Sequence, residues 1–149
     1  MKYLVYAAGK ESQFAVNFAC KKALRRGNTV EILHVIAPID TQNLFGVMAK
    51  VNQERWQEAE DLVKSISDKA FEYSGIIPAI QIREGKIGEE IIAATLKDNA
   101  ISMLVIGASQ ESRGMETINW LTAKLGSRLL IPLMLVPGNL TDLQIDELS

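Results

Sequence analysis

Cysteine and histidine are nearly absent from this chain of 149 residues, since each occurs only once, as Cys20 and His34. A single cysteine excludes a disulfide within the chain and fits a reducing compartment. A single histidine without a cysteine cluster gives no metal-ligand pattern, so no metal site is predicted. We expect Cys20 to pack as a small apolar side chain and His34 to be a structural residue inside a strand.

Net charge and long apolar runs are also low. The net charge of −2 gives no indication of binding to nucleic acid or to an anionic membrane. No window approaches the ~18 apolar residues that a membrane helix needs. The first apolar run stops before Lys10, which is too short for a signal peptide. We therefore expect a cytoplasmic protein with neither nucleic-acid nor membrane partners.

Apolar residues, in contrast, are plentiful, and they are arranged in regular patterns. Hydrophobic residues make up 48% of the chain and charged residues 23%, as in ordinary globular domains. One domain is expected at residues 1–138, followed by a polar C-terminal tail at 139–149 that we expect to be an arm or a frayed end. Segments with three- and four-residue apolar steps predict helices, and short apolar runs between them predict strands at 2–8, 29–36, 77–83, 101–106 and 133–136.

Strands alternating with helices predict an α/β fold with a doubly wound parallel sheet and helices on both faces. Ligands of such sheets bind beyond the carboxyl ends of the strands, where the strand order reverses. The residues to examine are therefore 8–10, 35–38 and 107–114. Gly107 is of particular interest, because a strand that ends in glycine and leads into a helix is an arrangement that holds phosphate groups.

Several motifs occur in an order that resembles the universal stress protein family, of the UspA-like type. They are the Gly9 turn after the first strand, LHVI, REGKIGEEI, MLVIGAS, LGSRLL and IPLMLVPG. The resemblance covers residues 1–138. It implies a five-stranded, Rossmann-like sheet of order 3-2-1-4-5 and a non-enzymatic regulator of the stress response. It also implies a homodimer that forms through the last strand, with contacts from Leu133, Met134, Leu135 and Val136. This strand is apolar and is expected at the edge of the sheet, where pairing of two copies would cover it.

One branch of that family binds ATP through a glycine, two residues, a second glycine, nine residues, and a glycine followed by serine or threonine. Gly107 matches the first glycine and Gly126-Ser127 the closing pair, but Gln110 stands at the middle position. Eighteen residues separate Gly107 from Gly126, more than the pattern has, and Gly114 is a displaced candidate for the middle glycine. The family's aspartate after the first strand, on the adenine side, is replaced by Ala8, whose side chain has no hydrogen-bonding group.

We therefore expect a modified and weak adenine-nucleotide pocket, for which ATP or AMP is the candidate ligand and no cofactor is required. Lys10, Arg113, Lys124 and Arg128 are cations near the loop, although such residues are more often solvated surface charges. Trp120 follows the loop, and packing is its expected role. The candidate nucleotide-binding residues are Ala8, Gly9, Val35, Ile106, Gly107, Gly114, Gly126, Ser127 and Arg128.

The alternative is a nucleotide-dependent enzyme, an ATP hydrolase or an adenylyl-transfer domain, on the same α/β fold. Such enzymes tend to have a serine- and glycine-rich loop with an aspartate after the first strand, which residues 7–12 match only faintly. Ser109 and Ser112 have no base indicated by the sequence. No catalytic residue is therefore predicted, and we expect that the protein is not an enzyme.

Overall fold

The computed structural model describes residues 1–38, 45–108, 118–120, 123–124 and 128–149, and only the backbone of residues 45–49. The strands are β1 (Lys2–Tyr6), β2 (Thr29–Ile36), β3 (Ala79–Glu84), β4 (Ile101–Ala108) and β5 (Leu133–Pro137). The helices are the short η1 (Lys10–Ser12), α1 (Gln13–Arg26), α2 (Phe45–Ser74), α3 (Ile87–Lys97) and α5 (Asp142–Leu148). Between β4 and β5, residues 118–120 and 123–124 are helical, and residues 109–117, 121–122 and 125–127 lie outside the described residues.

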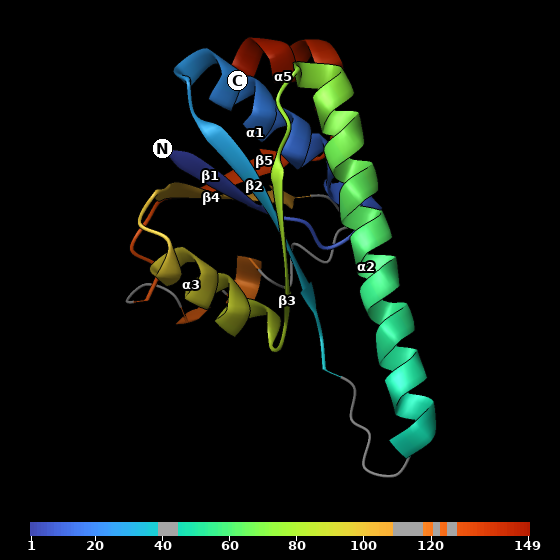
Figure 1. Cartoon of the computed structure of the whole chain (residues 1–149). Coiled ribbons are helices and arrows are strands. Elements are labelled where there is room, and N and C mark those ends of the chain that lie inside the picture. Colours follow the sequence, from blue (N-terminus) through green and yellow to red (C-terminus); the bar gives the residue numbers. More distant parts are fainter. Residues whose placement is uncertain (39–44, 109–117, 121–122, 125–127) are drawn as a thin grey trace.

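The five strands form one parallel sheet in the order β3-β2-β1-β4-β5, which confirms the predicted topology. Helices α1 and α2 lie on one face of the sheet and α3 lies on the other (Figure 1). Strands β3 and β5 are the two edges. The strand order reverses beside β1, so the carboxyl ends of the central strands mark the place where a ligand is expected.

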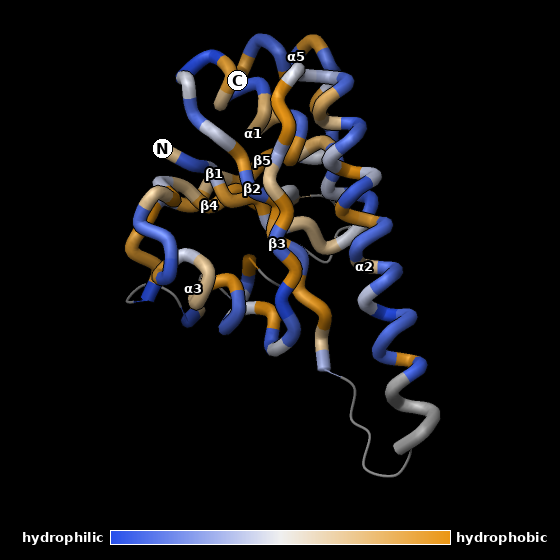
Figure 2. The backbone as a smooth tube through the Cα atoms, in the orientation of Figure 1, coloured by the Kyte–Doolittle hydropathy of each residue, from blue (hydrophilic) through white to orange (hydrophobic). Residues whose placement is uncertain are grey.

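Each face of the sheet carries its own hydrophobic core. Tyr3 and Val5 of β1 contribute to the core on the α1 and α2 side, whereas Leu4 and Tyr6 contribute to the core on the α3 side. This is the two-residue alternation of a strand, applied to a strand that is buried on both faces. Figure 2 shows the result as hydrophobic strands in the centre and a largely hydrophilic α2 outside.

Helix α2 packs on the sheet through its C-terminal half. Its buried residues Ala59, Val63, Ile66 and Ala70 recur at three- and four-residue steps, as expected for one apolar face. The N-terminal part of the helix reaches past the sheet (Figure 1). Among the helices in the described part of the chain, none has an apolar stretch long enough to cross a membrane.

The C-terminal residues form helix α5, and the prediction of an arm or a frayed end is wrong. Ile145 is buried in the core beside α1. Thr141 begins the helix with a capping box, in which its Oγ1 accepts from the Gln144 amide at 3.2 Å and its own amide donates to Gln144 Oε1 at 2.9 Å. Such reciprocal bonds satisfy amides that a helix start otherwise leaves unpaired. Lys21 and Arg25 of α1 also form ion pairs with Asp146, so buried and surface contacts together hold α5 against α1.

Candidate functional site

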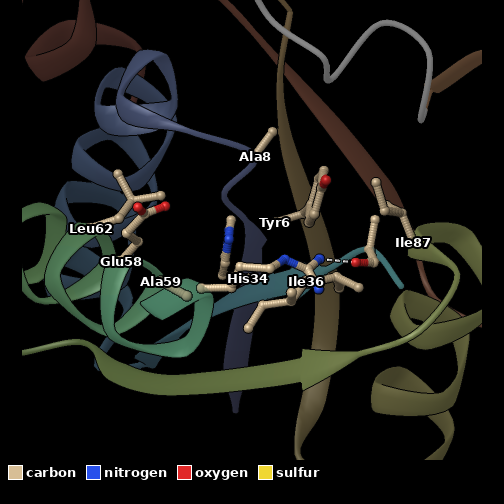
Figure 3. Close-up of a pocket in the computed structure, with 11 residues that line it drawn as sticks. Tyr6, Ala8, His34, Ile36, Glu58, Ala59, Leu62 and Ile87 are labelled. Carbon is tan, nitrogen blue, oxygen red and sulfur yellow. Dashed lines mark hydrogen bonds between the residues drawn. The ribbon is translucent and has the colours of Figure 1, made fainter. Parts of the chain in front are cut away.

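A cavity of about 320 Å³ lies at the carboxyl ends of β1 and β2, against α2. We call it the strand-end cavity. Its volume is at the lower end of the range for ligand pockets, about 300–1,000 Å³. Figure 3 shows His34 at its centre, with Glu58, Ala59 and Leu62 of α2 on one side and Tyr6, Ile36 and Ile87 on the other. The cavity is therefore at the edge of the sheet where the topology predicts a ligand.

His34 provides the strand-end cavity with a hydrogen-bond acceptor. Its Nδ1 lies 2.7 Å from the carbonyl oxygen of Ala7. Because a carbonyl oxygen can only accept, Nδ1 carries the hydrogen and donates, and in the neutral ring Nε2 is then an acceptor. Among the described residues, Nε2 has no hydrogen-bond partner. The structural role predicted for His34 therefore belongs to one ring nitrogen, and the other is available to a ligand.

The backbone at the end of β1 is hydrogen-bonded within the protein. The Ala8 amide donates to the hydroxyl of Ser12 at 3.1 Å, and the Ala7 amide donates to the Leu33 carbonyl at 2.9 Å. Ser12 is buried and precedes α1 without capping it through its side chain, since its oxygen is used by Ala8. Ala8 thus offers the cavity a methyl group, and the side chains there that can accept a hydrogen bond include His34, the carboxylate of Glu58 and the hydroxyl of Tyr6.

Gly107 faces α1, and its lack of a side chain serves packing. A Cβ atom at this position would lie 2.7 Å from Cζ of Phe14 and 3.3 Å from Cβ of Ala15. Glycine therefore lets the Phe14 ring rest directly on β4. Gly107 does not line the strand-end cavity. The glycine that the sequence suggests for phosphate binding has, in this structure, an observed packing function.

A second cavity, of about 620 Å³, lies beside the first turn of α3. Ala37 and Ile87 line both cavities, so the two adjoin. The second cavity is lined by three basic side chains, Lys86, Lys124 and Arg128, and we call it the cation cavity. Basic residues that share one cavity with an aromatic wall form a site with the character of an anion receptor, whereas the strand-end cavity is lined by one basic and one acidic side chain, Arg55 and Glu58.

Arg128 and Glu89 form a two-point ion pair within the cation cavity. Arg128 Nη1 donates to Glu89 Oε1 at 3.0 Å, and Nη2 donates to Oε2 at 2.8 Å. Hydrogen bonding by Arg128 lowers the pKa of the Glu89 carboxyl, and the same bond raises the pKa of the guanidinium. Both side chains are about half exposed, at 46% each, so water and salt screen the pair. The pair can therefore be broken by a competing anion.

Trp120 forms the aromatic wall of the cation cavity and packs against the start of α3. A Cβ on Gly88 would lie 2.4 Å from Cε3 of the Trp120 ring, so the ring rests on the backbone of that glycine. Trp120 also contacts the core on the α3 side of the sheet. The packing role expected for this tryptophan is confirmed, and it places the indole beside the three basic side chains.

The predicted nucleotide-binding residues do not all meet in one place. Ala8 and Val35 line the strand-end cavity, and Arg128 lines the cation cavity. Gly9, Ile106 and Gly107 line neither of the two. The remaining predicted positions lie outside the described residues: Gly114, Gly126 and Ser127, together with Gln110 and Arg113.

Sequence reasoning missed several residues of these cavities. Glu58 and Lys86 resemble ordinary surface charges in the sequence, and the free ring nitrogen of His34 is visible only once its partner is known. The available signal is the position of Lys86 in the turn between β3 and α3. This turn lies at the same edge of the sheet as the turns after β1 and β2. Lys10 lines a third cavity of about 370 Å³, between η1 and α2, which adjoins the strand-end cavity because Glu58 and Leu62 line both.

The residues predicted for a dimer contact lie on the edge strand β5. Leu135 is 47% exposed, Leu133 and Met134 are half-buried, and Val136 is buried in its own chain. Leu130 just before the strand is exposed as well. Within the described residues, no three His, Cys, Asp or Glu side chains lie close enough together to hold a metal ion.

The sequence and the fold were compared with those of known proteins. The model of the universal stress protein family matches residues 2–137. The universal stress protein UspA from Lactobacillus plantarum has a similar structure, with a TM-score of 0.73 and 16% identity over 91% of this chain and 97% of that one. A member of the family from Burkholderia pseudomallei has a TM-score of 0.66 and 16% identity over 91% and 95% of the two chains.

A further similar structure is a universal stress protein in complex with cAMP, with a TM-score of 0.60 and 14% identity over 91% of this chain and 96% of that one. At these identities the structures establish the shared fold. A comparison with curated proteins finds no match. The match of the family model over nearly the whole chain, together with the strand order, shows that the chain belongs to the universal stress protein family.

Proposed function

We propose that this protein is a non-enzymatic, dimeric regulator of the universal stress type that binds an adenine nucleotide weakly. The observation that carries the proposal is the strand-end cavity, which lies at the topological switch point of a chain that belongs to the family. A relative of the same fold is in complex with cAMP, which supports an adenine nucleotide as the ligand class. A cytoplasmic location is part of the same proposal.

The base would lie in the strand-end cavity, between β2 and α2. Apolar contacts come from Val35, Ala59 and Leu62, and the flat adenine ring is suited to such walls. The exocyclic amino group of adenine is a donor, and it needs the acceptor that Ala8 does not supply. We assign this role to His34 Nε2 and the Glu58 carboxylate, which both line the cavity.

Isothermal titration with adenosine, AMP, cAMP and ATP tests the proposal. We expect dissociation constants between about 10 µM and 1 mM, because one or two hydrogen bonds and a small apolar contact contribute only a few kcal/mol. Absence of binding for all four compounds at millimolar concentration would overturn the nucleotide part. A submicromolar affinity would contradict the weak pocket.

His34→Asn is the matched variant for the acceptor. The asparagine amide can keep the donor to the Ala7 carbonyl, which Nδ1 now provides at 2.7 Å, but it has no group at the position of Nε2. We expect adenosine affinity to fall about fivefold to tenfold, the size of one net hydrogen bond. His34→Gln, whose amide reaches toward the Nε2 position, should lose less. Equal affinities for all three proteins would exclude His34 from the site.

The regulatory and dimeric parts have their own tests. Steady hydrolysis of ATP by the purified protein would replace the regulator with the alternative, a nucleotide-dependent enzyme. For the dimer, antiparallel pairing of β5 about a two-fold axis would bring the exposed Leu135 side chains of two copies close together. Leu135→Glu should therefore shift the protein to monomers in sedimentation velocity, whereas Leu24→Glu on the exposed face of α1 should not.

A further inference from the structure

We propose that the cation cavity binds the phosphate groups of a nucleotide whose base lies in the strand-end cavity, and that the phosphates take Arg128 from Glu89. This inference rests on the proposed function. It names the residues that would bind phosphate in place of the family's glycine motif, from which this chain departs. Ala37 and Ile87 line both cavities, so a single ligand can extend from one cavity into the other.

The first support is the sorting of charge between the cavities. The strand-end cavity is lined by one cation, Arg55, whose guanidinium already donates to the Ala37 carbonyl, and by one carboxylate, Glu58. The cation cavity is lined by three cations and one carboxylate. A nucleotide consists of an uncharged base and sugar and of anionic phosphates. The balanced charges of the strand-end cavity suit the base, and the excess of cations in the cation cavity suits the phosphates.

The second support is the ion pair inside the cation cavity. The two oxygens of Glu89 are bound by the two terminal nitrogens of Arg128, at 3.0 Å and 2.8 Å. This is the fork geometry with which arginine binds phosphate oxygens as well as carboxylates. The chain's own carboxylate therefore occupies the position of a ligand anion, and a phosphate that brings more charge can replace it. The charges of Lys86 and Lys124 also lower the pKa of Glu89, so both lysines lie close to the position of the anion.

The size of the effect follows from exposure. Lys86, Lys124 and Arg128 are exposed side chains, so water competes for each contact. A charge-assisted hydrogen bond at such a site changes affinity by about fivefold to tenfold. We therefore expect ATP to bind more tightly than AMP, and AMP more tightly than adenosine. The advantage of ATP over adenosine should shrink as salt is raised from 20 to 500 mM, because screening weakens exposed charge pairs.

Calorimetric titration of the full chain with adenosine, AMP, ATP and inorganic tripolyphosphate tests the inference. Lys86→Gln and Lys124→Gln should each lower ATP affinity about fivefold to tenfold and leave adenosine affinity unchanged. Lys97→Gln is the matched control, since this exposed lysine lies at the other end of α3. If the Lys86 and Lys124 variants bind ATP as the Lys97 variant does, the inference is wrong.

Glu89→Gln tests the exchange of the arginine. Removing the carboxylate frees Arg128, so ATP affinity should rise threefold or more, with adenosine unaffected. The control is Glu90→Gln, which removes the same charge one residue along but breaks a pair with Arg83, at 2.7 Å, that is outside the cavity. Equal changes in the two variants would mean that only overall charge matters, and the exchange would be overturned.

Trp120 gives a second readout that is specific to this cavity. In a Trp56→Phe background the indole of Trp120 is the only one left, and it forms the wall of the cation cavity. ATP and tripolyphosphate should change its fluorescence, whereas adenosine should change it little. A response to adenosine as large as that to ATP would place the phosphates elsewhere and refute the inference.

Failure of the inference can be told from failure of the proposed function. If adenosine binds, ATP binds no more tightly, and the lysine variants have no effect, the base site stands and the phosphate site does not exist. If neither adenosine nor AMP binds but tripolyphosphate does, with Lys86→Gln weakening it, the cation cavity is an anion site and the nucleotide proposal fails. If no probe binds, both fail.

Discussion

Gly107→Ala should destabilise the protein because of one aromatic ring. The new Cβ would lie 2.7 Å from Cζ of Phe14, roughly 0.8 Å closer than the shortest ordinary carbon–carbon contact of about 3.5 Å. Phe14 is half-buried against the core, and the new Cβ would also lie 3.3 Å from Cβ of the buried Ala15, so the ring must shift to make room. Overpacking of this kind costs about 1–3 kcal/mol. A chain of this size should then lose about 2–10 °C in midpoint temperature.

A double-mutant cycle isolates this contact. Phe14→Leu removes the atom that clashes, so Gly107→Ala in that background should cost at least about 0.5 kcal/mol less than it does alone. The assay is urea unfolding of the four proteins at one fixed concentration, since any dimer would make stability depend on concentration. The m-value should be unchanged, which would show that the difference lies in the native packing.

Two results would refute the reasoning. A coupling energy below about 0.5 kcal/mol would mean that Phe14 does not define the role of Gly107. A Gly107→Ala/Phe14→Leu protein that is stable but has lost ATP binding would mean that the glycine acts on the ligand, as the family pattern implies. If that protein binds ATP as the Phe14→Leu protein does, packing is the function of this glycine.

Three further predictions concern other parts of the molecule. Burial raises the pKa of the Cys20 thiol to about 11, so the folded chain keeps a proton that the unfolded chain releases. In urea titrations between pH 9 and 11, stability should therefore fall by about 3 kcal/mol more in the unmodified protein than in Cys20→Ala, in which the raised pKa values of Tyr73 and Lys2 still contribute. Ile145→Ala should cost about 2–4 kcal/mol because this buried side chain docks α5, whereas Leu143→Ala, at an exposed position, should cost little. Hydrogen bonding by Arg128 lowers the pKa of Glu89, so carbon-detected NMR should show the Glu89 pKa rise toward its ordinary range in Arg128→Gln. The stability that this pair contributes is present above the ordinary pKa of a glutamate and is lost as the pH falls through the lowered pKa of Glu89.

The sheet could be predicted from the sequence because its central strands are apolar on both faces. The run 101–106 was expected as a strand, and β4 extends it only to Ala108. The order β3-β2-β1-β4-β5 followed from a resemblance spread over the whole chain. These features depend on local patterns and on connections between neighbouring elements, which a single sequence contains.

The candidate site was less predictable, because its properties depend on contacts between distant residues. Gly107 has the same sequence context whether it faces a phosphate or Phe14, ninety-three positions away. The tautomer of His34 depends on the Ala7 carbonyl. Helix α5 was missed because its composition is polar, although Thr141 and Gln144 carried the spacing of a capping box.

The two edges of the sheet differ in a way that limits how copies of the chain can assemble. Strand β5 is apolar, whereas β3 ends in Gln81, Arg83 and Glu84. Pairing of β5 with β5 uses the same patch twice and closes, leaving β3 at both outer ends. Pairing of β5 with β3 would leave one free edge of each kind and would continue into a filament. The polar residues in the C-terminal part of β3 therefore act against fibre growth, and replacing them with apolar residues would remove that protection.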